Sequence, residues 1–201
     1  VLRMRPNGPK LKKSELFSLL NFKKNFEYIV KNFKDGIFIT FESDVMVGKD
    51  IYQFSNFLNE IKDKKWDCIH IGMFQDNIYH TPTTSWISGY RNYGEPFPQP
   101  LKNYIKENGN GKYIEDNKRI NDKYRLIRKF HPRCMDSFIW KYNGIVKYLN
   151  FINKMDKNLS CPADYLLMHF LENNIDFKHY WSVNEFFKQA SNLGLVKSKI
   201  K

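Results

Sequence analysis

The stretch that decides the fold lies at residues 37–44 and reads Ile37-Phe38-Ile39-Thr40-Phe41-Glu42-Ser43-Asp44. Its first five residues are β-branched or aromatic, which is typical of a short strand that is buried on both faces, as in a parallel sheet. Two acidic residues follow this strand directly. The sequence therefore predicts a buried strand whose carboxyl end presents Glu42 and Asp44.

The segments around this strand predict an α/β domain. Before it, apolar residues recur at three- and four-residue steps from Leu16 to Phe33, which indicates an amphipathic helix. After it, Asp50 is expected to cap a second helix, and residues 66–71 read as another strand that ends at Gly72. A strand, a helix and a strand in this spacing form a crossover unit.

The rest of the chain continues the mixed pattern. Further strands are predicted at 125–130, 135–140 and 177–181, and further helices at 141–152 and after Pro162. Residues 73–123 are rich in Gly, Pro, Asn and aromatic residues, and we expect a mixture of loop and short helix there. No repeat or domain boundary is visible, so residues 1–201 are predicted to form a single domain.

The composition narrows the class of protein. Hydrophobic residues make up 42% of the chain and aromatic residues 16%, which is enough for a core and excludes a disordered chain. No apolar run approaches the roughly 18 residues of a membrane span, and the basic N-terminal segment does not read as a signal peptide. The three cysteines, Cys68, Cys134 and Cys161, are far apart. They favour a reducing compartment, and we expect a cytoplasmic protein.

The net charge of +12 favours anionic partners. Nucleic acid, an acidic membrane surface and a phosphorylated substrate all fit such a charge, and the charge alone does not choose among them. The many Lys, Asn and Ile residues are also typical of an AT-rich genome, in which lysines raise the charge without a functional meaning.

The acidic strand end is the candidate site. In open α/β sheets, ligands bind beyond the carboxyl ends of the strands. Glu42 and Asp44 are two residues apart and point to the same side if the strand geometry continues. Such a pair suits a hard divalent cation, which can stabilise a diphosphate as a leaving group. The alternative is that the acidic pair is only a turn that leads into the next helix.

Several short segments occur in an informative order between residues 14 and 192. They lie at 14–20, 38–45, 66–72, 137–149, 161–164 and 187–191. Together they resemble glycosyltransferase family 25, the lipopolysaccharide and collagen-galactosyltransferase type. The matching features of the family are, in turn, a helix, a strand ending in Glu-Asp-Asp-Val, a Trp-Asp strand ending in Gly, an Ala-Tyr-Ile-Ile-Ser-x-x-Gly-Ala block, a Pro-Val-Asp motif, and a Gln and a Ser after a strand.

The resemblance implies a fold and an activity. The fold would be GT-A-like, a mixed sheet flanked by helices, as in nucleotide-diphospho-sugar transferases. The activity would be the transfer of a sugar from a nucleotide-sugar, with a UDP-sugar expected, to a hydroxyl of a glycan or protein acceptor. A divalent metal would assist, with Mn²⁺ expected and Mg²⁺ as the alternative.

The resemblance also implies roles for single residues. Asp44 would bind the metal or the diphosphate, and Glu42 would be a second ligand or would orient a donor hydroxyl. Asp164 would face the acceptor and take the proton of its hydroxyl in an inverting transfer. The alternative for Asp164 is a first-turn acid that the helix dipole stabilises. Gln189 and Ser191 would contact the donor or acceptor, or would simply form a polar turn.

Two departures from the family qualify these expectations. Ser43 stands where the family has its central Asp, so one carboxylate of the motif is missing. The family's first strand and helix, which help to hold the nucleotide, have little room before Ser14. The chain is then either a piece of a longer protein or lacks part of the nucleotide site. The competing interpretations are a basic nucleic-acid-binding module, which ranks lower because no nucleic-acid motif is present, and a non-catalytic relative.

Other notable side chains have plain structural interpretations. His70 is expected to be a packed core histidine, and Cys68 a small buried hydrophobic residue. Aromatic residues in the long central segment would either stack on a sugar or cover the core; they are Tyr79, Trp86, Tyr90 and Tyr93.

Overall fold

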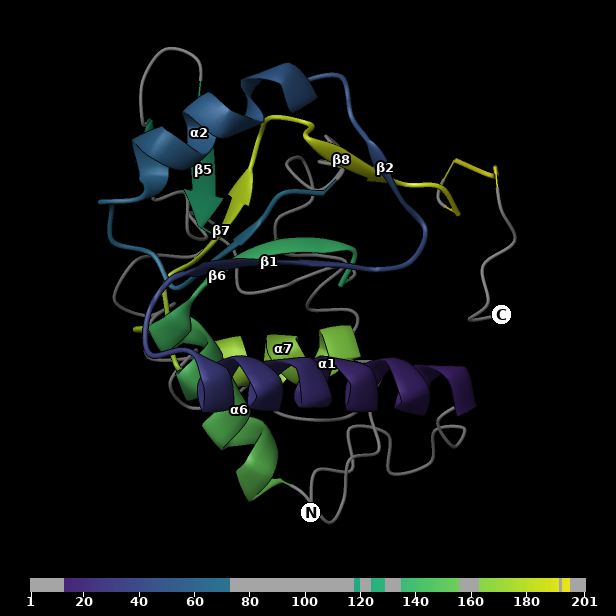
Figure 1. Cartoon of the computed structure of the whole chain (residues 1–201), viewed down its shortest axis with the longest axis vertical. Coiled ribbons are helices and arrows are strands. Elements are labelled where there is room, and N and C mark those ends of the chain that lie inside the picture. The colour runs from purple at the N-terminus through teal and green to yellow at the C-terminus, as the bar shows by residue number, and fades with distance from the viewer. Residues whose placement is uncertain are drawn as a thin grey trace, which may run out of the picture.

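The structure is a computed structural model that describes residues 13–72, 118–119, 124–128, 135–155, 163–191 and 193–195. These residues form a mixed α/β architecture, with a six-stranded sheet, a separate two-stranded ladder and flanking helices (Figure 1). The predicted α/β class and the mixed sheet flanked by helices are confirmed.

The elements follow the predicted order. They are α1 (Lys13–Asn32), β1 (Ile37–Phe41), β2 (Val45–Val47), η1 (Ile51–Gln53), α2 (Phe54–Ile61), β3 (Cys68–His70), β4 (Lys118–Arg119), β5 (Arg125–Arg128), β6 (Ser137–Lys141), α6 (Tyr142–Lys154), α7 (Ala163–Asn173), β7 (His179–Ser182) and β8 (Phe187–Gln189). The short strands β2, β4 and β8 were not predicted, because two or three residues carry too little pattern to be recognised.

The strand order in the large sheet is β1-β6-β3-β7-β5-β4. The strands β1 and β3 are each antiparallel to β6, so they run in the same direction, as the predicted crossover unit requires. They are not neighbours, however, since β6 lies between them. Among the described strands, only β3 and β7 pair in parallel. The sheet is therefore mixed, and its two central strands, β3 and β7, come from opposite halves of the chain.

The prediction that β1 is buried on both faces of a parallel sheet was wrong. In the part of the chain that the structure describes, it lies at the edge of the sheet and pairs only with the antiparallel strand β6. Its side chains alternate: Ile37, Ile39 and Phe41 are 39%, 37% and 47% exposed. The others are half-buried; Phe38 packs against the core beneath α1, and Thr40 accepts a hydrogen bond from the indole of a β6 tryptophan. The apolar composition of β1 fits such a half-covered edge as well as it fits a central strand.

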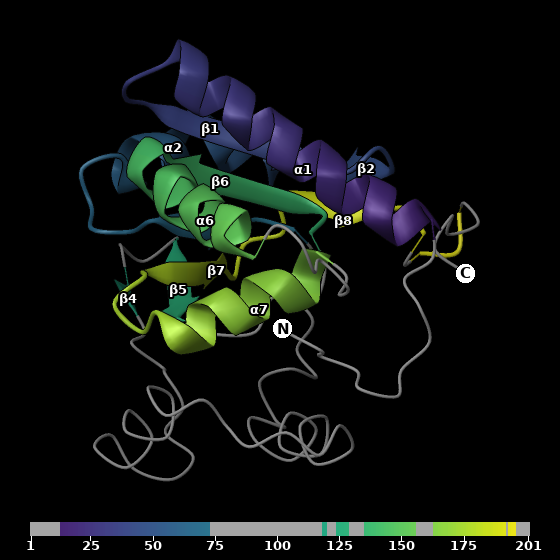
Figure 2. The same ribbon diagram turned by 90° about the horizontal axis from the view of Figure 1, so that it is seen from below.

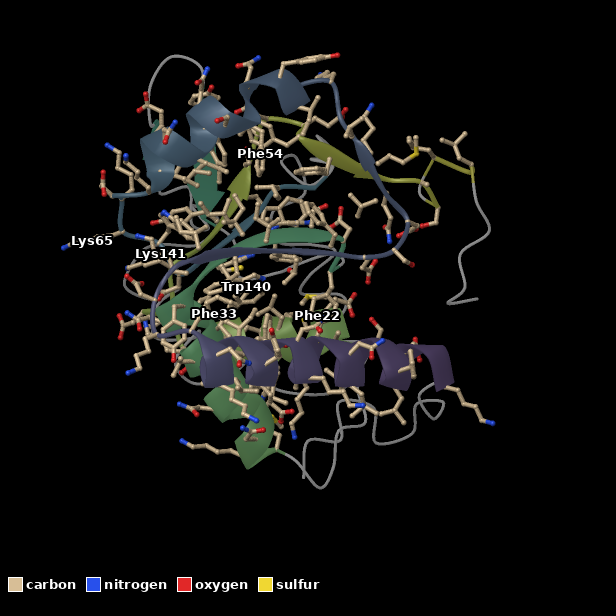
Figure 3. All side chains as sticks on the ribbon, in the orientation of Figure 1. Phe22, Phe33, Phe54, Lys65, Trp140 and Lys141 are labelled. Atoms are coloured by element: carbon tan, nitrogen blue, oxygen red, sulfur yellow. The ribbon has the colours of Figure 1, made fainter. Side chains whose placement is uncertain are left out.

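Three helices, α1, α6 and α7, cover one face of the sheet (Figure 2). Their core is aromatic: the ring of Phe26 lies 5.1 Å from that of Trp140 and 6.1 Å from that of Tyr148, measured between centroids. Phe22 and Trp140 lie between α1 and the sheet in Figure 3. Cys68 is fully buried in the same cluster, as predicted.

The other face of the sheet is covered by α2. Phe57 and Ile61 of this helix are fully buried, and Phe54 packs edge-on against Phe187 of β8 (Figure 3). Asp50 does not cap this helix, contrary to prediction; its carboxylate instead accepts a 2.8 Å hydrogen bond from the backbone N–H of Glu185. That bond ties the start of α2 to the segment that leads into β8.

The segment before β3 is held from two sides. The carboxylate of Asp67 accepts hydrogen bonds of 2.8 Å from the backbone N–H of Lys178 and from the ammonium group of Lys147. A Cβ atom on Gly144 would lie 2.3 Å from the Asp67 carbonyl oxygen, so only glycine allows α6 to approach this closely. These contacts fix β3 beside β6 and β7. None of the helices in the described ranges is long and apolar enough to cross a membrane.

Candidate active site

An acidic turn connects β1 to β2. Residues 42–44 do not continue the strand, because the N–H of Val45 hydrogen-bonds to the carbonyl of Glu42 at 3.3 Å. The strand β2 then pairs with β8, with Val45 opposite Gln189, and the N–H of Ala190 donates to the carbonyl of Asp44 at 2.9 Å. The two-stranded ladder therefore holds residues 189–191 alongside the acidic turn.

The side chains across this ladder are joined in pairs. The amide of Gln189 donates a 2.8 Å hydrogen bond to Oε2 of Glu42. The hydroxyl of Ser191 donates a 2.6 Å hydrogen bond to Oδ2 of Asp44. Gln189 and Ser191, the polar residues predicted from the sequence, thus lie next to Glu42 and Asp44, the acidic residues predicted from it. In this structure they donate hydrogen bonds to carboxylates; the sequence had left open whether they contact a donor or acceptor or simply form a polar turn.

Further carboxylates lie close to Glu42. Asp164 is in the first turn of α7, as predicted. Burial, together with the negative charges of Asp136, Asp44 and Asp164, raises the pKa of Glu42 to about 7, while the hydrogen bond from Gln189 acts in the opposite direction. The sequence prediction that Glu42, Asp44 and Asp164 belong to one site is therefore compatible with the structure, although its reasoning about strand alternation does not apply to a turn.

Sequence reasoning missed Asp136. The carbonyl oxygen of Asp136 accepts a 2.8 Å hydrogen bond from the backbone N–H of Glu42. Its buried carboxylate hydrogen-bonds to Nε2 of His70, at the end of β3. That carboxylate lies directly against Gly72, where a Cβ atom would be 2.0 Å from Oδ2. The ends of β1, β3 and β6 thus meet at Asp136.

The partner of Asp136 is a buried histidine. The ring of His70 stacks on Phe138 with centroids 4.5 Å apart and meets Trp181 edge-on at 4.4 Å. The sequence predicted a packed core histidine, and this burial is confirmed, but its acidic partner was not foreseen. Burial alone would raise the pKa of Asp136, and the charge and hydrogen bond of His70 lower it below its usual value. The pair therefore keeps a second carboxylate ionised beside Glu42.

The local sequence gave only a weak signal for this pair. An acidic residue directly before an apolar strand, and a histidine at the end of another strand, are both common features. The two residues are 66 positions apart in the sequence. They come together only because β6 pairs with β3 in the sheet. Only the sheet order brings the two side chains together.

Glu42 and Asp44 supply some, but not all, of the ligands that a divalent cation needs. Within the described ranges, no three His, Cys, Asp or Glu side chains are arranged as a ready-made metal site. Mg²⁺ and similar ions are, however, usually held by one or two carboxylates together with substrate phosphates and water. The charged groups that raise the pKa of Glu42 are all acidic, so a cation there would relieve their repulsion. Glu42 and Asp44 fit a metal that the substrate helps to bind.

Some predicted features lie outside the residues that the structure describes. They are the aromatic residues Tyr79, Trp86, Tyr90 and Tyr93, together with Cys134, Cys161 and Pro162. The chain matches no protein-family model, and no curated protein is significantly similar to it in sequence. The likeness to glycosyltransferase family 25 consequently stays a prediction from short motifs.

Proposed function

We propose that this chain is a glycosyltransferase domain that uses a nucleotide-sugar donor and a divalent metal. The observation that carries the proposal is the meeting of Glu42, Asp44, Gln189 and Ser191 at one end of β1. The two members of each pair are 147 positions apart, and each is a candidate site residue on sequence grounds alone. The negative charge of Asp164 also contributes to the raised pKa of Glu42.

In this proposal, Asp44 and Glu42 hold the metal, with Mn²⁺ preferred over Mg²⁺. The bound metal would neutralise the diphosphate of the donor and stabilise it as a leaving group. Gln189 and Ser191 have a positioning role. Each donates a hydrogen bond to one oxygen of a carboxylate and so fixes the orientation of the second oxygen of that carboxylate. Ser43 follows Glu42 in an exposed position and contributes no carboxylate.

Asp164 is proposed to accept the proton of the acceptor hydroxyl in an inverting transfer. It lies in the first turn of α7, and its charge contributes to the raised pKa of Glu42. The helix dipole favours a carboxylate at this position, and a carboxylate within reach of the acceptor hydroxyl can also accept its proton. The dipole interpretation and the catalytic one are therefore compatible.

The donor is proposed to be a UDP-sugar, and the acceptor a hydroxyl of a glycan or a protein. Both proposals rest on the resemblance to glycosyltransferase family 25. The carboxylates of the site are compatible with them, since a diphosphate needs a cation to approach a cluster of acidic groups. The alternatives are a non-catalytic domain that keeps the fold and a module that binds nucleic acid through its positive charge.

Calorimetry with UDP, in the presence and absence of MnCl₂, tests the proposal. We expect binding of UDP that requires manganese and that Asp44→Asn abolishes. The matched control is Asp35→Asn, an exposed acidic residue at the other end of β1, which should bind like the unchanged chain. A folded chain that binds no UDP with manganese, but binds an oligonucleotide in a salt-dependent way, would favour the nucleic-acid module.

A turnover assay separates the enzyme from a non-catalytic relative. We expect manganese-dependent release of UDP from a UDP-sugar, and a loss of at least about 100-fold in that rate in Asp164→Asn with manganese-dependent UDP binding retained, because a general base contributes typically 10²–10⁴-fold. Binding of UDP without any turnover would support the non-catalytic alternative.

A further inference from the structure

Asp136 is a buried acidic residue next to the acidic turn. It directly precedes β6, and its side chain, like that of His70 at the end of β3, is only 2% exposed. A Cβ atom on Gly72 would lie 2.0 Å from Oδ2 of Asp136, so the glycine leaves room for the carboxylate. The fold therefore accommodates one acidic side chain inside the sheet, at the end where the proposed site lies.

The carboxylate of Asp136 is held in its ionised form. Burial alone raises the pKa of Asp136, but the charge and hydrogen bond of His70, and then the backbone N–H groups of Ser137 and Asp136 itself, lower it below its usual value. A neutral imidazole already carries the N–H that the bond from Nε2 needs, and in that form the pair keeps one net negative charge. Because the carboxylate is buried and bonded in this way, it does not itself reach a ligand in the acidic turn.

This charge acts on Glu42. The backbone N–H of Glu42 donates a 2.8 Å hydrogen bond to the carbonyl of Asp136, which keeps the two residues side by side. Of the charged neighbours that raise the pKa of Glu42, Asp136 contributes the most, ahead of Asp44 and Asp164. A negative charge that favours a proton on a carboxylate also favours a metal cation there, and a divalent ion gains more from it than a proton does.

We infer that Asp136 is a positioning residue of the proposed cation site. Its fixed charge, oriented by His70, strengthens the binding of a divalent cation to Glu42 and Asp44 without contact between Asp136 and the cation. The inference rests on the proposed function, since it needs the cation that the proposed transfer uses. It gives the buried pair a role beyond packing.

Asp67 is the matched comparison within the chain. It directly precedes β3, is 8% exposed, and its carboxylate accepts hydrogen bonds from the ammonium group of Lys147 and the backbone N–H of Lys178. The lysine balances the charge of Asp67, and its contacts are structural. Replacing either aspartate by asparagine removes one buried carboxylate beside β3, but only the change at Asp136 alters the charge next to the acidic turn.

Binding of UDP as a function of the MnCl₂ concentration tests the inference. The titration is made at pH 8, above the pKa of about 7 of Glu42, so that a proton competes little with the metal. We expect the MnCl₂ concentration at half-maximal UDP binding to be at least about tenfold higher in Asp136→Asn, because an interaction worth one pKa unit changes an equilibrium tenfold. Asp67→Asn should need the same concentration as the unchanged chain.

Two further measurements separate the charge of Asp136 from its packing. Asp136→Ala removes the same charge and should raise the manganese requirement by a similar factor, so the result does not depend on how one replacement packs. Amide hydrogen exchange in Asp136→Asn should leave the N–H of Glu42 protected, because its acceptor is a main-chain carbonyl that the substitution retains.

The outcomes distinguish this inference from the proposed function. An unchanged manganese requirement in a folded Asp136→Asn variant would overturn the inference and leave the proposed function standing. An equal rise in Asp136→Asn and Asp67→Asn, or loss of protection at Glu42, would also overturn it, since either result indicates a structural effect. An unchanged chain that binds UDP equally well without manganese, or not at all, would contradict the proposed function and the inference with it.

Discussion

Gln189 and Glu42 are joined by a hydrogen bond of 2.8 Å, although 147 positions separate them in the sequence. The amide donates to the carboxylate, so the bond favours the ionised form of Glu42. It opposes the combined effect of burial and three neighbouring carboxylates, which raise the pKa of Glu42 to about 7. This balance makes Glu42 a sensitive reporter of the site.

Replacing Gln189 by leucine should raise the pKa of Glu42 further. The substitution removes the donor and leaves the acidic neighbours in place, so the ionised form loses its stabilising partner. Carbon-detected NMR titration of the Glu42 carboxyl group measures the change. Ser191→Ala is the matched control, because it removes a donor to Asp44 and leaves the Gln189 bond intact. An equal rise in both variants would contradict the assignment of that bond to Glu42.

Replacing Asp136 by asparagine should lower the pKa of Glu42. Among the charged neighbours of Glu42, Asp136 has the largest effect, and asparagine removes its charge while it keeps the size of the side chain. A fall of roughly one pKa unit is a reasonable expectation for one nearby carboxylate. The same NMR titration checks this expectation, with Asp35→Asn at the far end of β1 as the control. An unchanged titration would mean that Asp136 does not act on Glu42.

The contact between Gly72 and Asp136 predicts a strong energetic coupling. Gly72→Ala would place a Cβ atom 2.0 Å from the Asp136 carboxylate, so we expect a loss of about 1–3 kcal/mol in the free energy of unfolding. The loss should be smaller in an Asp136→Ala background, where the carboxylate no longer occupies that space. Urea denaturation of the four chains of this double-mutant cycle measures the coupling. Strictly additive effects would show that the two positions do not touch.

Glu172 predicts how stability depends on pH. It is fully buried on α7, its carboxylate oxygens have no hydrogen-bond partner among the described residues, and burial raises its pKa from 4.5 to about 9. Between these two values the folded chain retains a proton that the unfolded chain has lost. Its contribution to stability therefore falls as the pH rises through this window, by up to about 1.4 kcal/mol per pH unit.

Glu172→Gln should remove that dependence. The variant should gain stability relative to the unchanged chain as the pH rises from 5 to 8, which denaturation curves at several pH values measure. Glu60→Gln, an exposed carboxylate on α2, is the control and should keep the original slope. A Glu172→Gln variant that loses stability at pH 8 would indicate that the buried carboxylate is ionised and has a partner.

Sequence patterns predicted the helices well, because their information is local. The apolar stripe from Leu16 to Phe33 is visible without knowing what it packs against, and α1 follows it to within one residue at its C-terminal end, Asn32. The strands β1, β3, β5, β6 and β7 were also located, whereas the shorter strands β2, β4 and β8 were not. Their neighbours were not, since five apolar residues such as Ile37 to Phe41 suit an edge and a central strand equally. The insertion of β6 between β1 and β3 depends on long-range pairing that no local pattern encodes.

The same limit applied to the site. Glu42, Asp44, Asp164, Gln189 and Ser191 came from ordered motifs, and the structure brings them together. His70 lies in the 66–72 segment but was expected only to pack in the core, Asp136 lies in none of the segments, and their pairing arises only from the order of the strands. The identity of the family is a further step that neither the fold nor the contacts establish.

The ladder between β2 and β8 has a consequence for synthesis of the chain. Glu42 and Asp44 are made 147 positions before their partners Gln189 and Ser191. Until β8 has emerged, the acidic turn lacks these two hydrogen-bond donors, although the residues of α1, β1 and α2 have already been made. The paired arrangement at the acidic turn is therefore formed by late contacts, after the residues of most of the sheet have been synthesised.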